Sequence, residues 1–436
     1  MLPLDLYLVT FNCGRSFIDA KSFGEGVLQP YKGQSGLPDI ISISLQEIAP
    51  IAQSFLGGSY LKPYFDSIVE AIDRAAGADA SYMEVKRHNA GMTAIVVLAK
   101  ISVINRIQKV QTADIGVGDY GLGNKGAAGV RIHLRSSDDD SSDATSLTFV
   151  SAHLAPHETG VERRNKDWSD IVSGLSFSST NGIATEQSSV REFHRDNTIE
   201  SEPLLADDSS NDSTNEQAIA GMFNNFPLFF SGDLNYRASD VSPDDNDHQK
   251  FPQPVADTTD PKHFSHLLKQ DQLSRELNAG RTLQHMTEPS IDFPPTYKYD
   301  VNRYYKLTSE EPDTWYWAKH RQPSWCDRIL YSSYLTSNAM QVVLYSCTSI
   351  QPTSDHRPVG LSLRLDLQKA KSQSSDYKSP FPLDSQRIAR RNAARKREVV
   401  VGLGAYLGLT YEGRVISIAT MMGIIGLWFI SRSVFM

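Results

Sequence analysis

The chain is predicted to fold as a layered α/β domain followed by a membrane-spanning helix. Short runs rich in apolar and β-branched residues recur along the first 367 residues, and helical patterns lie between some of them. An uncharged apolar run, Val415–Ile430, lies near the other end of the sequence. Strands interspersed with helices favour packed layers, and an apolar content of 40% in 436 residues is enough for a substantial core.

The strands are expected where the apolar runs are short and bounded by polar or turn-forming residues. In chain order they are Leu4–Phe11, Ile40–Leu45, Thr93–Leu98, Ala127–Leu134, Leu147–Ala152, Pro227–Phe230, Ile329–Tyr334, Val342–Cys347 and Val359–Leu365. A helix is expected near Tyr60–Ala76, because apolar side chains from Tyr64 to Ile72 recur on one helical face. His263–Leu277 is a second expected helix.

Two polar stretches interrupt the expected domain, which covers residues 1–367. Residues 136–146 are expected to form a polar hairpin loop between two strands. Residues 176–216 are rich in Ser, Asn, Asp and Glu, and we expect a disordered insertion, because so few apolar side chains cannot offset the entropy of ordering. Residues 368–398 are expected to be a linker that ends in a basic stretch.

Residues 399–436 are expected to be a hydrophobic membrane anchor with its core at residues 415–430. As a helix this core would span about 24 Å, which suits the ~27 Å core of a thin bilayer such as the endoplasmic reticulum. Cations that precede it favour anionic lipid heads on the cytosolic side; they are Arg387, Arg390, Arg391, Arg395, Lys396 and Arg397. Only six residues follow Ile430, so we expect a tail anchor in the endoplasmic reticulum membrane with the preceding domain in the cytosol. A buried core helix is the alternative, but the run lacks an amphipathic period.

Charge and cysteine content exclude some classes of function. The net charge of −8 argues against a general nucleic-acid binder, which usually carries a basic surface. Three scattered cysteines are too few for a disulfide framework or a cysteine-based zinc site, so a reducing compartment fits best. The sequence indicates no protein partner.

Polar side chains stand where several expected strands end. Asn12 ends the first strand, Glu47 follows the second, His153 follows Leu147–Ala152, and Asp233 and Asn235 follow Pro227–Phe230. In layered α/β folds the carboxyl ends of strands converge on one crevice, where ligand groups sit. These residues are therefore candidates for one site.

Their chemistry suits phosphoester hydrolysis. A phosphate repels a nucleophile until its charge is neutralised, and Mg²⁺ does this while taking only a few protein oxygens. Glu47 and Asn12 can supply those oxygens, and Asp233 can hold and deprotonate an attacking water that Asn235 orients. His153 can donate hydrogen bonds to phosphate oxygens as charge builds.

Asp355 and His356 are adjacent, and on a strand they would point to opposite faces. Pro352 and Pro358 flank them, so we expect a loop that brings both side chains to the site, where His356 can also donate to phosphate. Residues 123–126 form either a plain tight turn or a glycine-permitted bend that presents Asn124 and Lys125 to an anion. Cys326 lacks an adjacent histidine and is expected to be a packing residue.

Together these segments resemble the inositol polyphosphate 5-phosphatases. The resemblance covers residues 3 to 367 apart from the polar insertions, and SGDLNYR with PSWCDRIL is its most specific part. The matching motifs are GLGNKGAAG (121–129), SAHLAPHE (151–158), ERRNKDW (162–168), SGDLNYR (231–237), PPTYKYD (294–300), PSWCDRIL (323–330) and SDHRPV (354–359). The anchor makes the chain similar to fungal members tethered to the endoplasmic reticulum.

This resemblance implies a four-layer α/β sandwich of the DNase I-like kind, with two facing β-sheets covered by helices. It implies Mg²⁺-dependent removal of the 5-phosphate from phosphatidylinositol 4,5-bisphosphate or related inositol phosphates. By resemblance, Glu47 and Asn12 hold the metal, Asp233 acts with Asn235 on the water, and the phosphorus is stabilised by His153, Asp355 and His356. The neighbouring 4-phosphate would be gripped by Tyr297, Lys298, Lys319 and Arg321. Asp327 and Arg328 would brace the site from behind.

The sequence departs from the family pattern at two positions. Phe11 stands where a tryptophan is usual, and Ser151 where an asparagine is usual. Neither change removes a charged group, although the second is expected to weaken the support of His153.

Two alternatives remain at the level of sequence. The first is a nuclease or sphingomyelinase of the same fold, against which SGDLNYR, PSWCDRIL, the acidic balance and the apolar tail all count. The second is a catalytically silent phosphoinositide-binding scaffold. A silent protein should have lost Glu47, Asp233 or His356, and all three are present.

Overall fold

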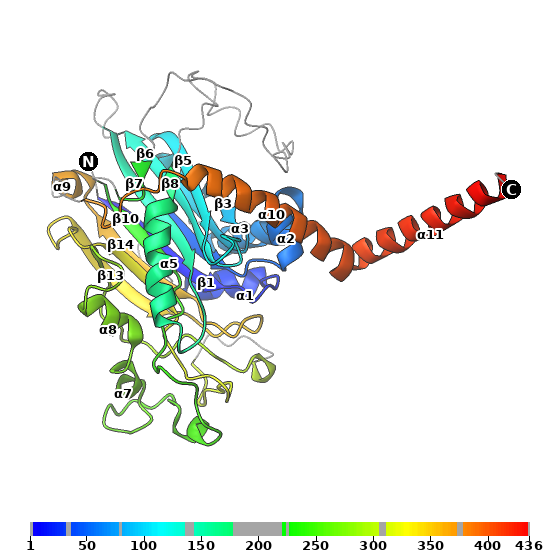
Figure 1. Ribbon diagram of the computed structural model, residues 1–436. Helices are drawn as coiled ribbons and strands as arrows, with labels where there is room; N and C mark the ends of the chain where they lie inside the picture. The colour runs from blue at the N-terminus through cyan, green and yellow to red at the C-terminus, as the bar shows by residue number, and fades with distance from the viewer. Residues whose placement is uncertain are drawn as a thin grey trace.

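Two six-stranded sheets pack face to face in the computed structural model (Figure 1), which describes residues 3–31, 36–77, 81–135, 144–177, 220–223, 226–304, 311–372 and 378–434. The first sheet has the order β13 (Met340–Cys347), β14 (Val359–Leu365), β1 (Leu4–Asn12), β2 (Ile40–Gln46), β4 (Thr93–Lys100) and β3 (Tyr82–Ala90). The second has the order β11 (Met286–Thr287), β12 (Asp327–Ser332), β10 (Leu228–Asp233), β7 (Ala144–His153), β6 (Gly126–Arg135) and β5 (Ile107–Gly116).

Helices cover the outer faces of both sheets and complete four layers. Helices α1 (Ala20–Val27) and α3 (Lys62–Ala76) pack through Phe23 and Ile68 on the outer face of the first sheet. Helix α5 (Val161–Gly174) packs through the buried Trp168 on the outer face of the second sheet. A third apolar cluster fills the space between the sheets, with Leu8 of one sheet and Phe149 of the other. The predicted four-layer α/β sandwich is therefore confirmed.

Shorter elements connect these layers. They are α2 (Ile51–Leu56), α4 (Ile101–Ile104), α7 (Phe264–Leu268), α8 (Gln272–Asn278), α9 (Leu367–Ser372), the small ladder of β8 (Ser176–Phe177) with β9 (Ala220–Gly221), and 3-10 turns at Gln29–Tyr31, Gly58–Tyr60, Asp247–Lys250 and Val301–Arg303. The helix expected at His263–Leu277 is instead two helices, α7 and α8. Asp271 causes the break, because its backbone is extended and its carboxylate caps α8 by accepting from Ser274 N.

Every expected strand forms, but several elements were not predicted, among them the edge strands β3 and β5 and helix α5. Strands β3 and β5 lie at the edges of the two sheets, where half-exposed polar residues such as Arg87 and Thr112 replace the apolar pattern. Helix α5 buries the charged residues Arg164 and Asp167 beside Trp168, so its sequence lacks the apolar stripe that would predict a buried helix face.

Two parallel strand pairs decide where polar strand ends meet. β1 runs parallel to β2, which sets Asn12 opposite Gln46, and β7 runs parallel to β10, which sets His153 opposite Asp233. Antiparallel β12 starts at Asp327, directly opposite Asp233. The carboxyl ends of four strands and the start of a fifth therefore lie at one end of the sandwich.

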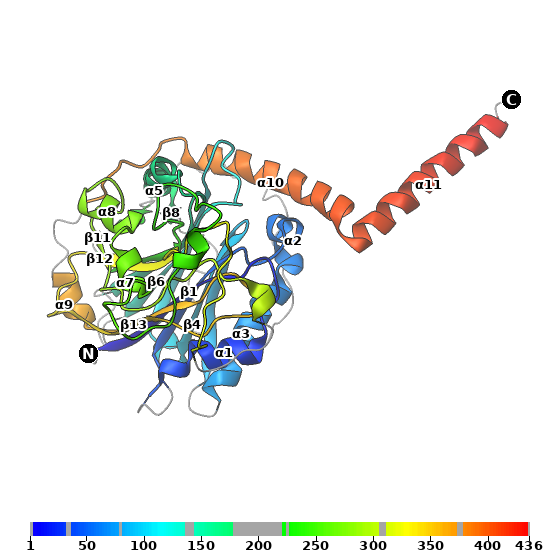
Figure 2. The same cartoon turned by 90° about the horizontal axis from the view of Figure 1, so that it is seen from below.

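The expected linker at residues 368–398 is partly helical. Helix α10 (Arg387–Leu409) begins inside it and lies along the domain beside α2, whereas α11 (Tyr411–Val434) projects away (Figures 1 and 2). The physical reason is that α10 carries a buried carboxylate, Glu398, with partners on the domain. Of the expected polar loops, residues 136–143 and 178–219 lie outside the described residues, 144–146 belong to β7, and 176–177 form β8.

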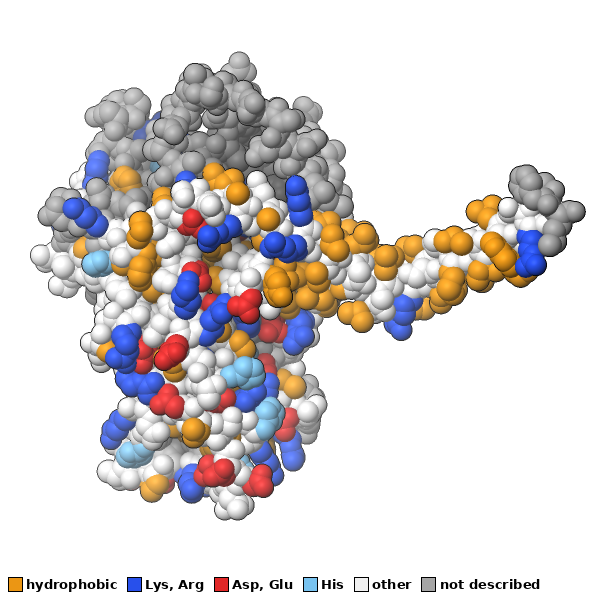
Figure 3. All heavy atoms as spheres, viewed as in Figure 1, with side chains coloured by type: hydrophobic (Ala, Val, Ile, Leu, Met, Phe, Trp, Pro, Cys, Tyr) orange, Lys and Arg blue, Asp and Glu red, His pale blue; other side chains and the backbone are white. Residues whose placement is uncertain are grey.

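Helix α11 exposes apolar side chains along its length (Figure 3). Its segment Tyr411–Ser433, which contains the expected core at residues 415–430, is long and apolar enough to cross a membrane, and 6% of it is buried against the rest of the chain. This exposure distinguishes α11 from the core helix of a soluble domain.

Candidate active site

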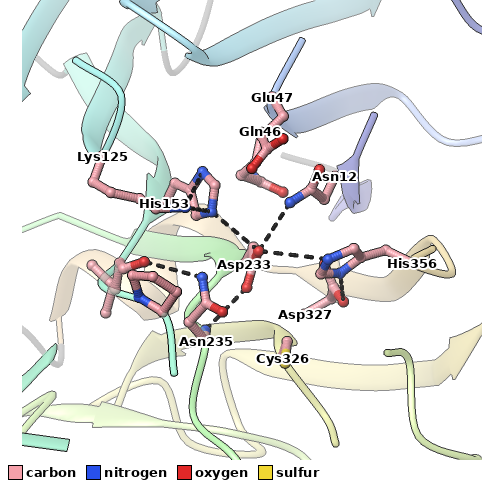
Figure 4. Close-up of polar contacts among 12 residues, drawn as sticks. Asn12, Gln46, Glu47, Lys125, His153, Asp233, Asn235, Cys326, Asp327 and His356 are labelled. Atoms are coloured by element: carbon pink, nitrogen blue, oxygen red, sulfur yellow. Dashed lines mark hydrogen bonds and ion pairs between the residues drawn. The ribbon is translucent and has the colours of Figure 1, made fainter. Parts of the chain in front are cut away.

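The two sheets are joined at their shared end by a hydrogen bond between polar strand ends. Asn12 Nδ2 donates to Asp233 Oδ2 over 3.0 Å, and both side chains are buried (Figure 4). Asn12 ends β1 of the first sheet and Asp233 ends β10 of the second, so residues 221 positions apart in sequence meet here. The predicted convergence of these strand ends is present in the structure.

Asp233 is the centre of this cluster. Its Oδ2 lies 3.2 Å from His153 Nε2 and 3.8 Å from His356 Nε2, and its Oδ1 accepts from the Asn235 backbone N–H over 3.1 Å. Burial alone raises the pKa of a carboxyl group, but His153, His356 and Lys125 outweigh it, so the pKa of Asp233 lies well below its usual value. Asp233 is therefore an ionised, hydrogen-bonded carboxylate at neutral pH.

His356 reaches the cluster from a loop, as the flanking prolines predicted. Ser354 Oγ fixes that loop by donating to the Asn12 carbonyl (2.6 Å) and accepting from the His356 N–H (3.1 Å). His356 Nδ1 lies 2.9 Å from Asp327 Oδ2. Burial opposes a charged imidazole, but Asp327 and Asp233 outweigh it and raise the pKa of His356 to about 9. His356 is thus cationic at neutral pH.

His153 has the opposite electrostatic environment. Burial lowers its pKa, and the Lys125 ammonium group against its ring lowers it further. Burial also lowers the pKa of Lys125. His153 is therefore neutral at pH 7 and can donate one hydrogen bond. Asn124, the neighbour of Lys125 on the turn, is exposed and has no hydrogen-bond partner within the described residues.

Asn235 adopts a left-handed backbone conformation, with φ +58°. Its Nδ2 donates to the Leu154 carbonyl over 3.0 Å, and the guanidinium of Arg237 contacts its carbonyl and side-chain oxygens. The same guanidinium lies 4.4 Å from the ring centroid of Tyr297. Arg237 therefore holds Asn235 and Tyr297 together, a role that the sequence interpretation missed although SGDLNYR contains it.

Oxygen donors suitable for a hard cation lie beside Asp233. Figure 4 shows Glu47 and Asn12 next to each other above the Asp233 carboxylate. Glu47 has a positive φ of +46°, which turns its side chain out of the β2 register, and Arg15 Nε pairs with its Oε2 at 2.8 Å. Oxygen atoms, of carboxylates above all, are the ligands that Mg²⁺ prefers, so this donor set fits the cation.

A second cluster, made of Asp233, Asp327 and His356, also has its potential ligand atoms within 4.8 Å of one another. Its imidazole Nδ1 is already engaged by Asp327, which in turn accepts from Thr296 Oγ1 over 2.7 Å. Because His356 is cationic, both of its ring nitrogens carry protons and neither can bind a cation, so we interpret this cluster as a hydrogen-bonded chain that orients His356.

The predicted phosphate-binding residues fall into two groups. Lys298 is ion-paired with Asp355 beside His356. Arg321 Nη1 lies 3.2 Å from the buried Glu158 Oε2. Lys319 is exposed and carries no ion pair within the described residues. Lys298 and Arg321 would have to give up an ion pair to bind a phosphate, whereas Lys319 could bind one without breaking an ion pair among the described residues.

Other predicted residues support the site from outside it. Asp327 orients His356, whereas Arg328 lies away from the cluster, paired with Asp271 at 2.9 Å and with Glu288 at 2.5 Å. Burial raises the pKa of Cys326 well above its ordinary value, which agrees with its expected packing role.

Ser151, which stands where the family usually has asparagine, accepts from Gln46 Nε2 over 3.3 Å and so links the two sheets. The contacts of His153 described above are with Asp233 and Lys125, so its position does not depend on Ser151. Gln46 and Arg15 are further residues that the sequence interpretation missed. Gln46 had a detectable signal, because it is a polar residue at a buried strand end beside Glu47.

Comparisons with known proteins agree with this architecture. Residues 9–362 match the endonuclease/exonuclease/phosphatase family 2 model. The chain is 28% identical over 334 residues to the mouse type II inositol 1,4,5-trisphosphate 5-phosphatase, covering 76% of this chain and 27% of that protein. It is also 28% identical over 335 residues to the polyphosphatidylinositol phosphatase INP53 of Saccharomyces cerevisiae, covering 76% and 24%. The chain thus spans about a quarter of the length of these curated relatives.

A solved structure shows the same fold. The inositol polyphosphate 5-phosphatase domain of SPsynaptojanin, in complex with inositol (1,4)-bisphosphate and a calcium ion, superposes with a TM-score of 0.58 and 22% identity, covering 92% of each chain. The family model extends over most of the two-sheet domain and includes the strand ends that carry Asn12, Asp233 and Asp327. The resemblance inferred from the motifs is confirmed, and the chain belongs to the endonuclease/exonuclease/phosphatase family 2, with inositol polyphosphate 5-phosphatases among its relatives.

Proposed function

We propose that this protein is a Mg²⁺-dependent phosphatase that removes the 5-phosphate of phosphatidylinositol 4,5-bisphosphate. The observation that carries the proposal is the ionised Asp233 carboxylate between one neutral and one cationic histidine, with the Glu47 and Asn12 oxygens beside it. This combination can neutralise a phosphate, orient water and stabilise new negative charge at one end of the sandwich. The names of the relatives support the inositol phosphate class of substrate.

Each side chain has a distinct part in the proposed reaction. Glu47 and Asn12 would hold Mg²⁺, which neutralises charge on the substrate phosphate when bound. Asp233 accepts a hydrogen bond from the attacking water, and its backbone contact with Asn235 fixes the carboxylate plane. His356, as a cation, donates a hydrogen bond to a phosphoryl oxygen, and Lys125 adds positive charge beside His153.

The low pKa of Asp233 is compatible with this role. Phosphate monoesters react through a loose transition state in which the nucleophile has gained little bonding, so the water needs orientation more than a strong base. A carboxylate that stays ionised can provide that orientation throughout the neutral pH range. His356 stays protonated over the same range because its pKa is raised to about 9.

The test is phosphate release by the full chain from vesicles that contain single phosphoinositide isomers, with and without Mg²⁺. We expect release from the 4,5-bisphosphate, and none when a chelator removes Mg²⁺. Abasic duplex DNA and sphingomyelin serve as parallel substrates. Cleavage of either one without phosphoinositide hydrolysis would assign the site to the nuclease or sphingomyelinase class instead.

We also propose that α11 attaches the enzyme to a thin bilayer such as the endoplasmic reticulum, with the catalytic domain on the cytosolic side. The exposed apolar surface of Tyr411–Ser433 supports attachment, and outward-facing Arg390, Lys396 and Arg397 on α10 suit anionic lipid heads. Flotation of the full chain with liposomes tests attachment, and loss of flotation on replacing residues 411–434 by a polar linker is expected.

Removing the proposed 4-phosphate contacts should affect one substrate selectively. The Lys319→Ala, Arg321→Ala double variant is expected to lower kcat/KM for the 4,5-bisphosphate about 100-fold, because two charge-assisted hydrogen bonds are lost. Turnover of a 5-monophosphate should change little, since it lacks the adjacent group. The assay uses short-chain soluble lipids of both kinds.

The single variant Lys319→Ala separates binding from folding, because Lys319 has no side-chain partner among the described residues, whereas removing Arg321 leaves the buried Glu158 without its ion pair. Lys21→Ala on α1 also removes an exposed cation and serves as the matched control. Equal losses on both substrates would contradict a 4-phosphate contact.

A further inference from the structure

Helix α10 reaches the active-site turn through one buried carboxylate. Glu398 is completely buried, and its Oε1 accepts the Gly123 backbone N–H over 3.1 Å. Gly123 lies two residues before Lys125, whose ammonium group contacts His153. A residue of the helix that leads into α11 therefore touches the turn that carries a cation of the catalytic cluster.

The remaining contacts of Glu398 are with two arginines of the same helix. Arg391 Nη1 lies 2.8 Å from its Oε1, and Arg395 Nη1 lies 3.3 Å from its Oε2. Arg391 also pairs with Asp114 of β5, next to the turn, and this contact helps to hold the pKa of Asp114 below its usual value against the opposing effect of burial. A buried carboxylate without such partners would be strongly destabilising. The two arginines therefore allow Glu398 to be buried against the domain.

Helix α10 is anchored at a second place on the domain. Arg395 donates from Nη1 to the Phe55 carbonyl (2.6 Å) and from Nη2 to the Leu56 carbonyl (3.2 Å), which are free carbonyls at the end of α2. Gly402 lets the helix approach closely, because a Cβ there would lie 2.9 Å from Phe55 Cβ. These contacts fix the position of Glu398 relative to the sheets.

The turn itself is held from both sides at Gly123. Its carbonyl accepts the Met92 N–H over 2.7 Å, while its N–H is held by Glu398. A Cβ at Gly123 would lie 2.7 Å from the Gly91 backbone nitrogen, so the backbone packs directly on the β3–β4 turn. The carbonyl of Gly123 is held by the β3–β4 turn and its N–H by α10. Both contacts restrict the backbone conformation just before Lys125.

We propose that Glu398 is a positioning residue of the active site, which holds Gly123 and thereby sets the placement of Asn124 and Lys125. Helix α10 is then part of the catalytic unit, although its sequence reads as a basic linker before the membrane segment. The consequence for activity rests on the proposed function, since it requires Lys125 to act on the scissile phosphate. The contact between α10 and the turn does not depend on that function.

The structural part is tested by amide hydrogen exchange on the full chain in detergent. In Glu398→Ala we expect exchange in a peptide covering residues 117–126 to accelerate at least tenfold, because Gly123 loses its acceptor. Glu398→Gln retains an oxygen acceptor and should keep most of the protection. Asn392→Ala changes an exposed α10 residue with no hydrogen-bond partner within the described residues, and it should behave as wild type.

The functional part is tested with a soluble short-chain phosphatidylinositol 4,5-bisphosphate, so that membrane attachment does not enter. Glu398→Ala is expected to lower kcat about tenfold with a smaller change in KM, because Lys125 acts on the reacting group. In a Lys125→Met background the same change should cost less than about twofold, since residues acting through one contact are not additive. Glu398→Gln should restore most of the activity.

Several results would overturn the proposal. These are unchanged exchange of the turn in Glu398→Ala, an equal kinetic loss in both Lys125 backgrounds, and unfolding of both the Ala and Gln variants at the assay temperature. The last result would make Glu398 a general stability residue, whereas the proposal predicts a local loss. If wild type released no phosphate, the proposed function would fail while the exchange experiment still decided whether α10 holds the turn.

Discussion

The Asp233→Asn variant is expected to release phosphate at least about 10³-fold more slowly than wild type, with the fold intact. Asparagine has the same shape but only one acceptor oxygen, so it can keep the hydrogen bond from the Asn235 N–H or the one from Asn12, not both. It carries no charge, so it no longer offsets the positive charge of the cluster around His153 and His356. It also accepts only a weak hydrogen bond from water. Initial rates on soluble phosphatidylinositol 4,5-bisphosphate at saturating Mg²⁺ measure the effect.

The matched control is Asp73→Asn, which removes one exposed carboxylate from α3 and should leave the rate unchanged. Thermal unfolding of both variants checks the fold. Because Asp233 is part of the charge balance that raises the pKa of His356, Asp233→Asn should also lower that pKa from about 9. A variant that turns over at the wild-type rate would remove Asp233 from the mechanism and favour the silent-scaffold alternative.

The candidate site was predictable to the extent that it follows from strand ends. Asn12, His153 and Asp233 each end a short apolar run, and the parallel pairing of their strands brings such ends to one edge whatever the details of packing. Asp355 and His356 needed one further step, the inference of a loop from flanking prolines. The Asn12–Asp233 hydrogen bond could not be predicted, because it joins two different sheets and depends on how they face each other.

Edge strands and charged contacts account for most of what the sequence did not reveal. β3 and β5 have one neighbouring strand each in their sheets and are partly solvated, so their polar residues resemble those of a loop. In α10, a local reading counts Arg391 and Arg395 as membrane-facing cations. In the structure both pair with the buried Glu398, and only tertiary contacts distinguish these inward residues from outward ones such as Lys396.

Replacing Glu47 by glutamine should raise the Mg²⁺ concentration needed for half-maximal activity at least tenfold. A hard divalent cation depends on the negative charge of its ligands, and the amide keeps an oxygen but loses that charge. At a fixed low Mg²⁺ concentration the rate should therefore fall steeply and recover in part when Mg²⁺ is added. Calorimetric titration of the substrate-free protein with Mg²⁺ measures affinity independently of turnover.

Arg15→Met provides the control for this experiment, because Arg15 Nε pairs with Glu47 Oε2 at 2.8 Å. If Glu47 serves as a cation ligand, the guanidinium competes with Mg²⁺ for the same carboxylate, and removing it should leave Mg²⁺ affinity unchanged or increase it. If Glu47 only forms a surface ion pair, the two variants should behave alike, since either change breaks that pair. Opposite shifts in Mg²⁺ affinity would therefore identify Glu47 as a ligand, and parallel shifts would assign the cation to other oxygens of the cluster.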